Sequence, residues 1–489
     1  MDGSRDEFDE LQASLAHALE LNHPDGEDEH VLVALPSFSL GESLLSHYED
    51  RIPALEHRYL LGLFMLNRLE HASMVLVVSE APAPEVLDYY VSLLPPARQA
   101  TVRRRLHVLE VPDVGARAIA AKLLDRPDLI KGLRDHIGAR TAFIEPWNVT
   151  DDEVEVALQL RAPINGSSPA LWPLGFKSAG RRLFRESGVP LPVGSEDVRS
   201  VDDVLAAIAT VRAERPLVGG VVLKLDDSGA GDGNVVLDLR TPGELRTALD
   251  GLPDWYLQDL ATGGVVEELI TGTRFASPSA QIDVLPDGSV GVLATHEQVL
   301  GGVGGQVYMG CRFPADPAYA ARLAHYARMV GERLAARGVV GRASVDFAAA
   351  LGADGTWSVH ALEVNLRKGG TTHPYSALRN LVPGRYDDDG ARWITADGSE
   401  RSYWSTDNLL DPSWQGLRPS VVIDQLAAEG LEFDIEAGTG VVLHMLSCLA
   451  IDGRLGLTAI GRTPEHAADL YEAAAAAISS AAGREDAFG

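Results

Sequence analysis

Lysine, cysteine and long apolar runs are all scarce in this 489-residue chain. The two cysteines, Cys311 and Cys448, imply no disulfide framework, so we expect two buried thiols and a reducing, cytoplasmic location. No apolar run reaches the ~18 residues that a membrane span needs, and the acidic N-terminus is unlike a signal peptide. These shortages argue against a disulfide-stapled secreted domain and against an integral membrane protein.

Positive charge is also in deficit, with 42 Lys and Arg against 70 Asp and Glu and a formal net charge of −28. This balance argues against nucleic acid and against an anionic membrane as partners, because their phosphate groups would be repelled. Three lysines, Lys177, Lys224 and Lys368, fall in the motifs described below. In a chain whose positive charges are mostly arginine, a lysine indicates a position that requires a compact ammonium group rather than a planar guanidinium. The acidic surface would suit a cationic substrate, although a generally acidic soluble surface is the simpler explanation.

The length predicts about three domains at typical domain sizes. Residues 1–160 alternate short apolar strands with helices, including an apolar helix over 58–70, and this alternation predicts a parallel α/β sheet. Residues 161–375 contain predicted strands, glycine-rich loops and a long helix that leads into a hairpin. Residues 376–489 include a turn-rich joint at 385–390 and predict a smaller α+β domain.

Two apolar strands flank residues 353–356, where an Asp-Gly pair predicts a tight hairpin turn. Alternate residues of a strand share a face, so Glu363, Asn365 and Arg367 should point the same way. Asp346 would come beside them from the partner strand. Two carboxylates, an amide oxygen and a guanidinium would hold Mg²⁺ on a polyphosphate and offset the charge that develops at phosphorus. The open alternative is an amphipathic hairpin with a solvated acidic face.

A glycine loop follows the predicted strand that contains Lys224. Glycines at alternate positions, Gly229, Gly231 and Gly233, let backbone N–H groups approach an anion closely. The loop is not a Walker A motif, because no Gly-Lys-Ser/Thr follows, and no helix opens after it as a dinucleotide fingerprint requires. A plain hairpin turn is the alternative.

Two adjacent carboxylates, Glu267 and Glu268, lie in an apolar strand predicted over 265–270. Adjacent strand residues face opposite ways, so one of the two points inward and needs a hydrogen-bond donor. An adenine amino group or a ribose hydroxyl would serve as that donor. A solvated strand end is the alternative.

The order of these motifs resembles the ATP-grasp superfamily over residues 165–374. The resemblance implies an N-terminal pre-ATP-grasp α/β domain (1–160), an ATP-grasp core of two α+β subdomains (161–375) and a small C-terminal α+β domain (376–489). A more specific similarity is to the peptide ligase of pheganomycin biosynthesis and its relatives. The segments that carry this second similarity are residues 296–302, 305–311, 363–374 and 438–446.

The resemblance implies ATP and Mg²⁺ as cofactors and assigns roles by position. The residues holding and covering the nucleotide phosphates would be Lys177, Lys224, Ser228, Gly229, Gly231, Gly233 and Asn234. The adenine hinge would be Glu267, Glu268, Leu269 and Ile270. The Mg²⁺ ligands would be Asp346, Glu363 and Asn365, while Arg367 would act with Lys224 in catalysis by steadying the acyl phosphate and the tetrahedral intermediate.

Other positions carry weaker expectations. Candidate substrate contacts are Gln306, Tyr308, Lys368 and His373, with a packing or surface role as the alternative for each. Arg274 stands where many relatives have a ribose-binding acid, which puts the ribose contacts in doubt.

The implied activity is ATP-dependent joining of a carboxylate to an amine through an acyl phosphate, in peptide natural-product metabolism. The partners would be a small-molecule carboxylate donor and an amine or peptide acceptor, and a homodimer is left open. One alternative is an ATP-binding sensor or scaffold without turnover, although such proteins usually lose a metal ligand or a phosphate lysine. A biotin-carboxylase-like enzyme is the other. Residues 369–372 argue against it, because Gly-Gly-Thr-Thr stands where glutamine and glutamate would be expected.

Overall fold

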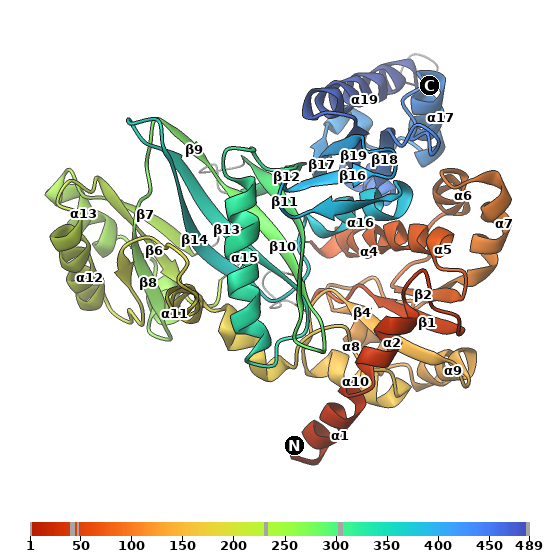
Figure 1. Cartoon of the computed structure of the whole chain (residues 1–489), viewed down its shortest axis with the longest axis horizontal. Coiled ribbons are helices and arrows are strands. Elements are labelled where there is room, and N and C mark those ends of the chain that lie inside the picture. The colour runs from red at the N-terminus through yellow and green to blue at the C-terminus, as the bar shows by residue number, and fades with distance from the viewer. Residues whose placement is uncertain (1, 40–44, 46–47, 229–232, 302–306, 486–489) are drawn as a thin grey trace.

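The computed structural model describes residues 2–39, 45, 48–228, 233–301 and 307–485 (Figure 1). Its strands form a four-stranded parallel sheet, a four-stranded antiparallel sheet and an eleven-stranded central sheet. The small antiparallel sheet lies on one side of the central sheet, and the N- and C-terminal parts of the chain lie together on the other. No helix among the described residues is long and apolar enough to cross a membrane.

The N-terminal unit is a parallel sheet of order β3-β2-β1-β4, as the strand–helix alternation predicts. Its strands are β1 (His30–Leu35), β2 (Ala72–Val78), β3 (Leu106–Glu110) and β4 (Thr141–Pro146). Its helical segments are α1 (Asp2–Gln12), α2 (Leu15–Leu21), η1 (Glu49–Arg51), α4 (Ile52–Glu56), η2 (His57–Phe64), α5 (Met65–Arg68), α6 (Pro84–Ser92), α7 (Pro96–Arg105), α8 (Ile119–Leu124), α9 (Pro127–Ile137) and α10 (Asp151–Leu160). Val31 and Val33 pack with α1, α8, α9 and α10, whereas Leu32 and Ala34 pack with η2 and α6. Burial on both faces explains why β1 reads as an uninterrupted apolar run.

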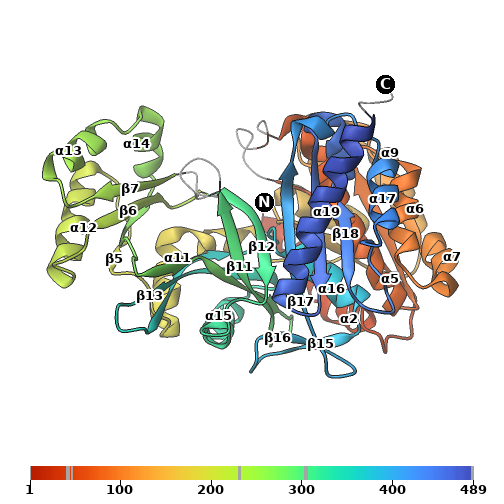
Figure 2. The ribbon, with the colours of Figure 1, turned by 90° about the horizontal axis from the view of Figure 1, so that it is seen from above.

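The small antiparallel sheet has the order β5-β8-β6-β7 and stands apart from the rest in the view of Figure 2. Its strands are β5 (Gly194–Ser195), β6 (Gly220–Leu225), β7 (Asn234–Asp238) and β8 (Gly264–Glu268), and its helices are α12 (Val201–Glu214), α13 (Pro242–Asp250) and α14 (Asp254–Leu260). Val204, Ile208 and Val211 recur at helical spacing and cover Val221 and Leu223 of β6. Before this sheet, η3 (Pro169–Gly175) and α11 (Lys177–Ser187) follow the N-terminal unit.

The central sheet runs in the order β14-β13-β10-β11-β12-β17-β16-β15. Its strands, with the three that lie off this path, are β9 (Arg274–Ala276), β10 (Pro278–Val284), β11 (Val290–Gly301), β12 (Val307–Phe313), β13 (Gly341–Leu351), β14 (Trp357–Asn365), β15 (Gly384–Asp387), β16 (Arg392–Thr395), β17 (Glu400–Leu410), β18 (Gly440–His444) and β19 (Arg454–Gly461). One face is covered by α15 (Ala320–Ala335), whose Leu323 and Val330 pack with Ile282, Ala343 and Val345. Alternate residues of these strands therefore point to the opposite face, which carries the polar side chains of the site.

The C-terminal segment extends the central sheet, because β17 pairs with both β12 and β19. Its helical segments, with the helix before it, are α16 (Thr372–Leu381), η5 (Pro412–Trp414), α17 (Pro419–Ala428), η6 (Leu446–Cys448), α18 (Leu449–Asp452) and α19 (Pro464–Glu485). The boundary predicted at 375/376 falls inside α16. One apolar cluster joins Leu76 of β2, Leu378 of α16 and Val442 of β18. The N- and C-terminal parts thus share a core, and the division into three domains stays a prediction.

Two local expectations need correction. The helix predicted over 58–70 is a 3₁₀ segment followed by a four-residue α-helix that ends at Arg68. Within the 3₁₀ segment, Gly62 lets the backbone approach Met74 of β2. The joint predicted over 385–390 begins as strand β15, paired with β16, and only its end forms the turn. Both differences come from tertiary contacts that local sequence patterns do not report.

Candidate active site

The central hairpin brings the predicted metal ligands together. β13 and β14 are antiparallel, with Asp346 opposite Glu363 and Ser344 opposite Asn365. The Nδ2 group of Asn365 donates to Asp346 Oδ2 over 3.0 Å, and Gln298 Nε2 donates to Asp346 Oδ1 over 2.8 Å. The amide nitrogen of Asn365 is thereby engaged, which leaves its carbonyl oxygen free to bind a cation.

The electrostatics of this cluster suit a divalent cation. Burial, followed by the charge of Glu363, raises the pKa of Asp346 to about 7, and Arg367 acts in the opposite direction. Two adjacent carboxylates repel each other when both are ionised, and a bound divalent cation would offset that repulsion. The oxygen donors of Asp346, Glu363 and Asn365 are of the kind that Mg²⁺ takes, so the residues present fit this ion.

The two predicted phosphate lysines are both buried and both ion-paired. Lys177 is the first residue of α11, and its Nζ donates to Glu363 Oε1 over 3.0 Å and to the main-chain carbonyl of Ser228. Lys224 lies near the end of β6, with its Nζ 2.5 Å from Glu267 Oε2. Lys177 therefore links the glycine loop to the metal-ligand hairpin. A polyphosphate between these groups would meet two ammonium groups and the carboxylates that hold its metal ion.

The predicted adenine hinge is partly different from expectation. Glu267 is 2% exposed, and Arg181 Nη1 donates to its Oε1 over 2.6 Å, so protein cations already satisfy this carboxylate. Glu268 accepts from the main-chain N–H of Val193 over 2.8 Å. The inward carboxylate takes its donors from Arg181 and Lys224 rather than from a nucleotide group, and the assignment of residues 267–270 to an adenine hinge stays a prediction. Beyond Glu268 the strand ends, leaving Leu269 and Ile270 half-buried.

The glycine loop is only partly described. Gly229, Gly231 and Gln306 lie outside the described residues. Gly233 has φ of 88°, and its carbonyl accepts from Tyr256 Oη over 2.8 Å. Asn234 opens β7 opposite Lys224, so the described ends of the loop meet beside the phosphate lysine.

The remaining predicted residues lie in or beside the same region. Arg367 Nη1 donates to the main-chain carbonyl of Lys368 over 3.0 Å. Lys368 is buried with its Nζ 2.6 Å from Glu145 Oε1, and burial lowers its pKa, so it is not a surface lysine. The Tyr308 ring packs against Gly370, where an added Cβ would come within 2.4 Å of it. Arg274 projects from β9 over the Trp357 ring, 5.3 Å from its centroid.

His373 belongs to a buried cluster that the sequence did not suggest. Its Nε2 lies 2.9 Å from Asp407 Oδ1, and His444 Nε2 lies 2.7 Å from the same oxygen. Arg58 Nη1 donates to the other oxygen, Oδ2, over 2.7 Å and also stacks on Trp147. These two histidines and the aspartate are a geometrically possible metal group. Arg58 already supplies the cationic partner, so this arrangement is a charge-matched network.

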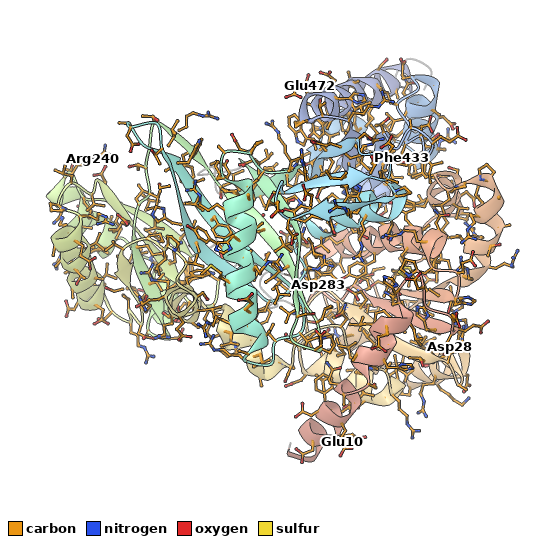
Figure 3. The ribbon with its side chains drawn as sticks, in the orientation of Figure 1. Glu10, Asp28, Arg240, Asp283, Phe433 and Glu472 are labelled. Atoms are coloured by element: carbon orange, nitrogen blue, oxygen red, sulfur yellow. The ribbon has the colours of Figure 1, made fainter. Side chains whose placement is uncertain are left out.

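A cavity of about 700 Å³ adjoins the hairpin. Its lining includes Arg58, Trp147, Arg342, Lys368 and His373, and it lies between the N-terminal unit, β10 and α16. Asp283 of β10, labelled in Figure 3, is part of the same lining at the junction of these elements. This size falls within the range of small-molecule pockets.

The polar face of the central sheet connects this cavity to the metal ligands. Arg342 and Asp346 lie on the same face of β13, four residues or about 13 Å apart. Lys368 follows Arg367 directly, and its main-chain N–H bonds the carbonyl of Trp147 over 3.1 Å. The cavity therefore begins at Arg342 and Lys368, at the end of the hairpin's polar face.

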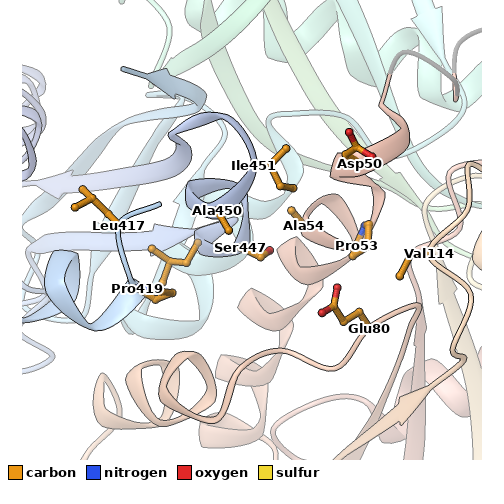
Figure 4. A pocket seen from close by; sticks show the side chains of 11 residues that line it. Asp50, Pro53, Ala54, Glu80, Val114, Leu417, Pro419, Ser447, Ala450 and Ile451 are labelled. Atoms are coloured by element: carbon orange, nitrogen blue, oxygen red, sulfur yellow. The ribbon is translucent and has the colours of Figure 1, made fainter. Parts of the chain in front are cut away.

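A second cavity of about 360 Å³ lies between the N-terminal unit and the C-terminal segment (Figure 4). Its walls are mainly apolar, with Pro53 and Ala54 facing Ala450 and Ile451, and Asp50 and Glu80 are its acidic members. None of the predicted site residues that the structure describes lines it.

The side chains of the site that were not predicted include Gln298, Arg181 and Arg58. Gln298 falls in residues 296–302, a segment that carried the family resemblance. The sequence therefore indicated that this segment was relevant but gave Gln298 no role. Arg181 lies one helical turn after Lys177 and so shares its face of α11. Nothing local to Arg58 indicates its partner, which is 349 residues away.

Comparison with known proteins places this chain in a family. The chain is 34% identical over 453 residues to L-propargylglycine–L-glutamate ligase of Streptantibioticus cattleyicolor, which covers 88% of this chain and 92% of that protein. The chain belongs to the ATP-grasp family of ligases. Residues 421–474 also match the PGM1 C-terminal domain. The resemblance on which the sequence expectations rested is thereby confirmed.

Solved structures of other ATP-grasp enzymes share the fold. The biotin carboxylase domain of 2-oxoglutarate carboxylase from Hydrogenobacter thermophilus has a TM-score of 0.54 at 14% identity, covering 91% of this chain and 89% of that chain. The N5-carboxyaminoimidazole synthetase of Staphylococcus aureus has a TM-score of 0.51 at 12% identity, covering 91% and 97%. At such low identity, these likenesses concern the fold alone.

Proposed function

We propose that this ATP-grasp ligase binds ATP and Mg²⁺ between the small sheet and the central hairpin, and joins a carboxylate to an amine in the 700 Å³ cavity. The observation that carries the proposal is the continuous polar face of the central sheet. Asp346, Glu363 and Asn365 occupy one end of it, the paired lysines face that end, and the cavity opens at Lys368.

The reaction has two steps. An oxygen of the donor carboxylate attacks the γ-phosphorus of ATP, the bond to the β–γ bridging oxygen breaks, and ADP leaves. The amine nitrogen then attacks the carbonyl carbon of the acyl phosphate, phosphate departs, and the amine loses a proton as the amide forms.

The chain's own residues serve both steps. Lys177 and Lys224 present ammonium groups to the phosphates, exchanging contacts with their present carboxylate partners. Arg367, close enough to Asp346 to influence its pKa, would face the developing oxyanion of the second step. A bound Mg²⁺ held by Asp346, Glu363 and Asn365 would offset charge on the phosphate oxygens.

The substrates of the ligase from S. cattleyicolor, as its name states them, are amino acids. We extend that class to this chain: an amino acid-like carboxylate donor and an amino acid or peptide amine as acceptor. The 700 Å³ cavity suits this class, because drug-sized ligands occupy about 300–1,000 Å³. The peptide natural-product setting and a homodimer stay predictions.

ADP formation tests the proposal. The purified chain is incubated with MgATP and pairs drawn from the standard L-amino acids and L-propargylglycine, and products are read by mass spectrometry. We expect ADP only when donor and acceptor are both present, together with an amide of their summed mass less water. Binding of ATP without turnover in every pairing would favour a sensor, and ADP formation that requires bicarbonate would favour a carboxylase-like reaction.

Glu363→Gln provides the matched negative control for turnover. It removes a metal-ligand charge while keeping the side chain's size, and Glu155→Gln on the exposed face of α10 is the companion variant. We expect the first to abolish ADP formation and the second to leave it unchanged.

A further inference from the structure

The 700 Å³ cavity is a groove between two helical segments that run in the same direction. At its inner end, Arg58 of η2 and His373 of α16 both bond Asp407, over 2.7 and 2.9 Å. At its outer end, Arg68 of α5 donates to the main-chain carbonyl of Arg379 of α16 over 2.9 Å. One face of each segment lines the space between these two ends.

The inner end of the groove is the end nearest the reaction. Lys368 lines it, and this residue follows Arg367 directly in the chain. From His373 to Arg379, six residues of α16 span about 9 Å. An extended peptide advances about 3.3 Å per residue, so the groove has the length of an amino acid with a long side chain or of about three residues of an extended peptide.

The cations of the groove fall into two classes. Three have carboxylate partners: Arg58 with Asp407, Arg342 with Asp283 at 3.3 Å, and Lys368 with Glu145 at 2.6 Å. Among the described residues, Arg68 and Arg379 have no carboxylate within ion-pair distance. They lie next to each other, half-buried and exposed respectively, at the outer end. The inner cations are thus neutralised, while two positive charges at the mouth remain available.

The surroundings of Arg68 disfavour the charged form of its guanidinium group. Burial, followed by the charge of Arg379, lowers the pKa of the Arg68 guanidinium. An anion between two arginines removes that repulsion, and a planar guanidinium fits a carboxylate with two parallel hydrogen bonds.

We propose that Arg68 and Arg379 bind a substrate carboxylate that is not activated in the reaction. This inference rests on the proposed ligase function and adds to it the substrate class: a molecule long enough to place a spectator carboxylate at the outer end of the groove, about 9 Å from the inner end. A peptide acceptor of this length keeps such a carboxylate at its C-terminus. A dicarboxylic donor also keeps one, and the two sources share the same recognition chemistry.

Binding to matched pairs of probes tests the inference. The probes are the standard L-amino acids, L-propargylglycine and L-alanyl-L-alanine, each as the free acid and as the C-terminal amide. Their affinities are measured by thermal-shift titration of the full chain saturated with Mg²⁺ and a non-hydrolysable ATP analogue. Because a hydrogen bond to a charged group is strong, we expect at least one acid to bind about 10- to 100-fold more tightly than its amide.

Substitutions assign that preference to the two arginines. Arg68→Gln and Arg379→Gln should each reduce the acid-over-amide preference, and Arg68→Lys, which keeps the charge, should retain part of it. Arg134→Gln, on the exposed surface of α9, is the matched control. The melting temperature without probe shows whether each variant is folded. An acid preference that is absent from wild type, or that survives in both Gln variants, overturns the inference.

Steady-state kinetics identify which substrate supplies the carboxylate. They also distinguish a failure of this inference from a failure of the proposed function. In the Gln variants, a raised KM for the acceptor alone identifies the acceptor's carboxylate, and a raised KM for the donor alone identifies the donor's. If wild type forms no ADP with any pair but still binds acids in an arginine-dependent way, the proposed function fails and the carboxylate site stands. If amide forms and neither KM changes, the carboxylate site fails and the ligase stands.

Discussion

Lys224 and Arg181 hold the same buried carboxylate, and their removal should have opposite consequences. Lys224→Met deletes the 2.5 Å contact to Glu267 Oε2 but leaves Arg181 Nη1 at 2.6 Å from Oε1. The buried charge keeps a partner, so the free energy of unfolding should fall by only about 1 kcal/mol. Affinity for an ATP analogue with Mg²⁺ should fall about 10- to 100-fold, because a charged hydrogen bond to phosphate is lost.

Arg181→Met should do the reverse. Arg181 is 2% exposed and also bonds Glu196 through its Nε over 2.8 Å, so its removal weakens two carboxylate contacts at once. Glu267 keeps Lys224 and Glu196 keeps Arg185, so the cost comes from two lost charged hydrogen bonds and is about 3–5 kcal/mol, larger than for the single contact of Lys224. Lys224 remains, and nucleotide affinity should stay within about threefold of wild type, a margin of under 1 kcal/mol.

Urea unfolding followed by fluorescence and calorimetric titration with the ATP analogue measure both quantities. The reasoning is refuted if Lys224→Met binds the analogue and turns over as wild type does. It is also refuted if that variant loses as much stability as Arg181→Met, because Glu267 would then depend on both cations equally.

Three further predictions concern the hairpin and the histidine cluster. Arg367→Ala should keep ATP-analogue affinity within about tenfold while amide formation falls about 10²–10³, and Arg367→Lys should rescue little. Lost binding with a normal rate at saturating nucleotide would move Arg367 to the phosphate site. Glu363→Gln should lose the Mg²⁺ dependence of analogue binding, measured by titrating the metal; an unchanged dependence would contradict the ligand assignment. Burial lowers the pKa of His373 to about 4, so the folded protein carries fewer protons than the unfolded chain between pH 6.5 and 4. The free energy of unfolding therefore decreases as pH falls through that window. His373→Gln should reduce this decrease by up to about 3 kcal/mol, as urea unfolding at pH 7 and 4.5 would reveal.

The central hairpin was predictable because its determinants are local. Gly355, with φ of 81°, forms the turn between β13 and β14, and side-chain alternation places Glu363 beside Asp346. A bulge opposite Phe347 shifts the register by one residue without separating those two carboxylates. The parallel N-terminal sheet was predictable for a similar reason, since its central strands β1 and β2 are buried on both faces and read as apolar runs.

The partners of the buried charges were not predictable. Glu267 is inward-facing, as its strand position implies, but the identity of its donors depends on how α11 docks against β8. Strand β17 has no regular alternation of polar and apolar residues and was missed altogether, although it joins the C-terminal segment to the central sheet. In both cases the deciding contacts span large separations in sequence, where composition and periodicity carry no information.

Asp407 gives the C-terminal segment a physical connection to the site. Its carboxylate lies on β17 and is bonded by Arg58 from the N-terminal unit, His373 from α16 and His444 from β18. Burial alone would raise the pKa of Asp407, yet its partners hold that pKa well below the usual range, so the carboxylate stays charged at the inner end of the groove. A charge buried this deeply is tolerated only where its donors are fixed in place. The position of Arg58 above Trp147, and with it the inner wall of the substrate cavity, therefore depends on all three parts of the chain.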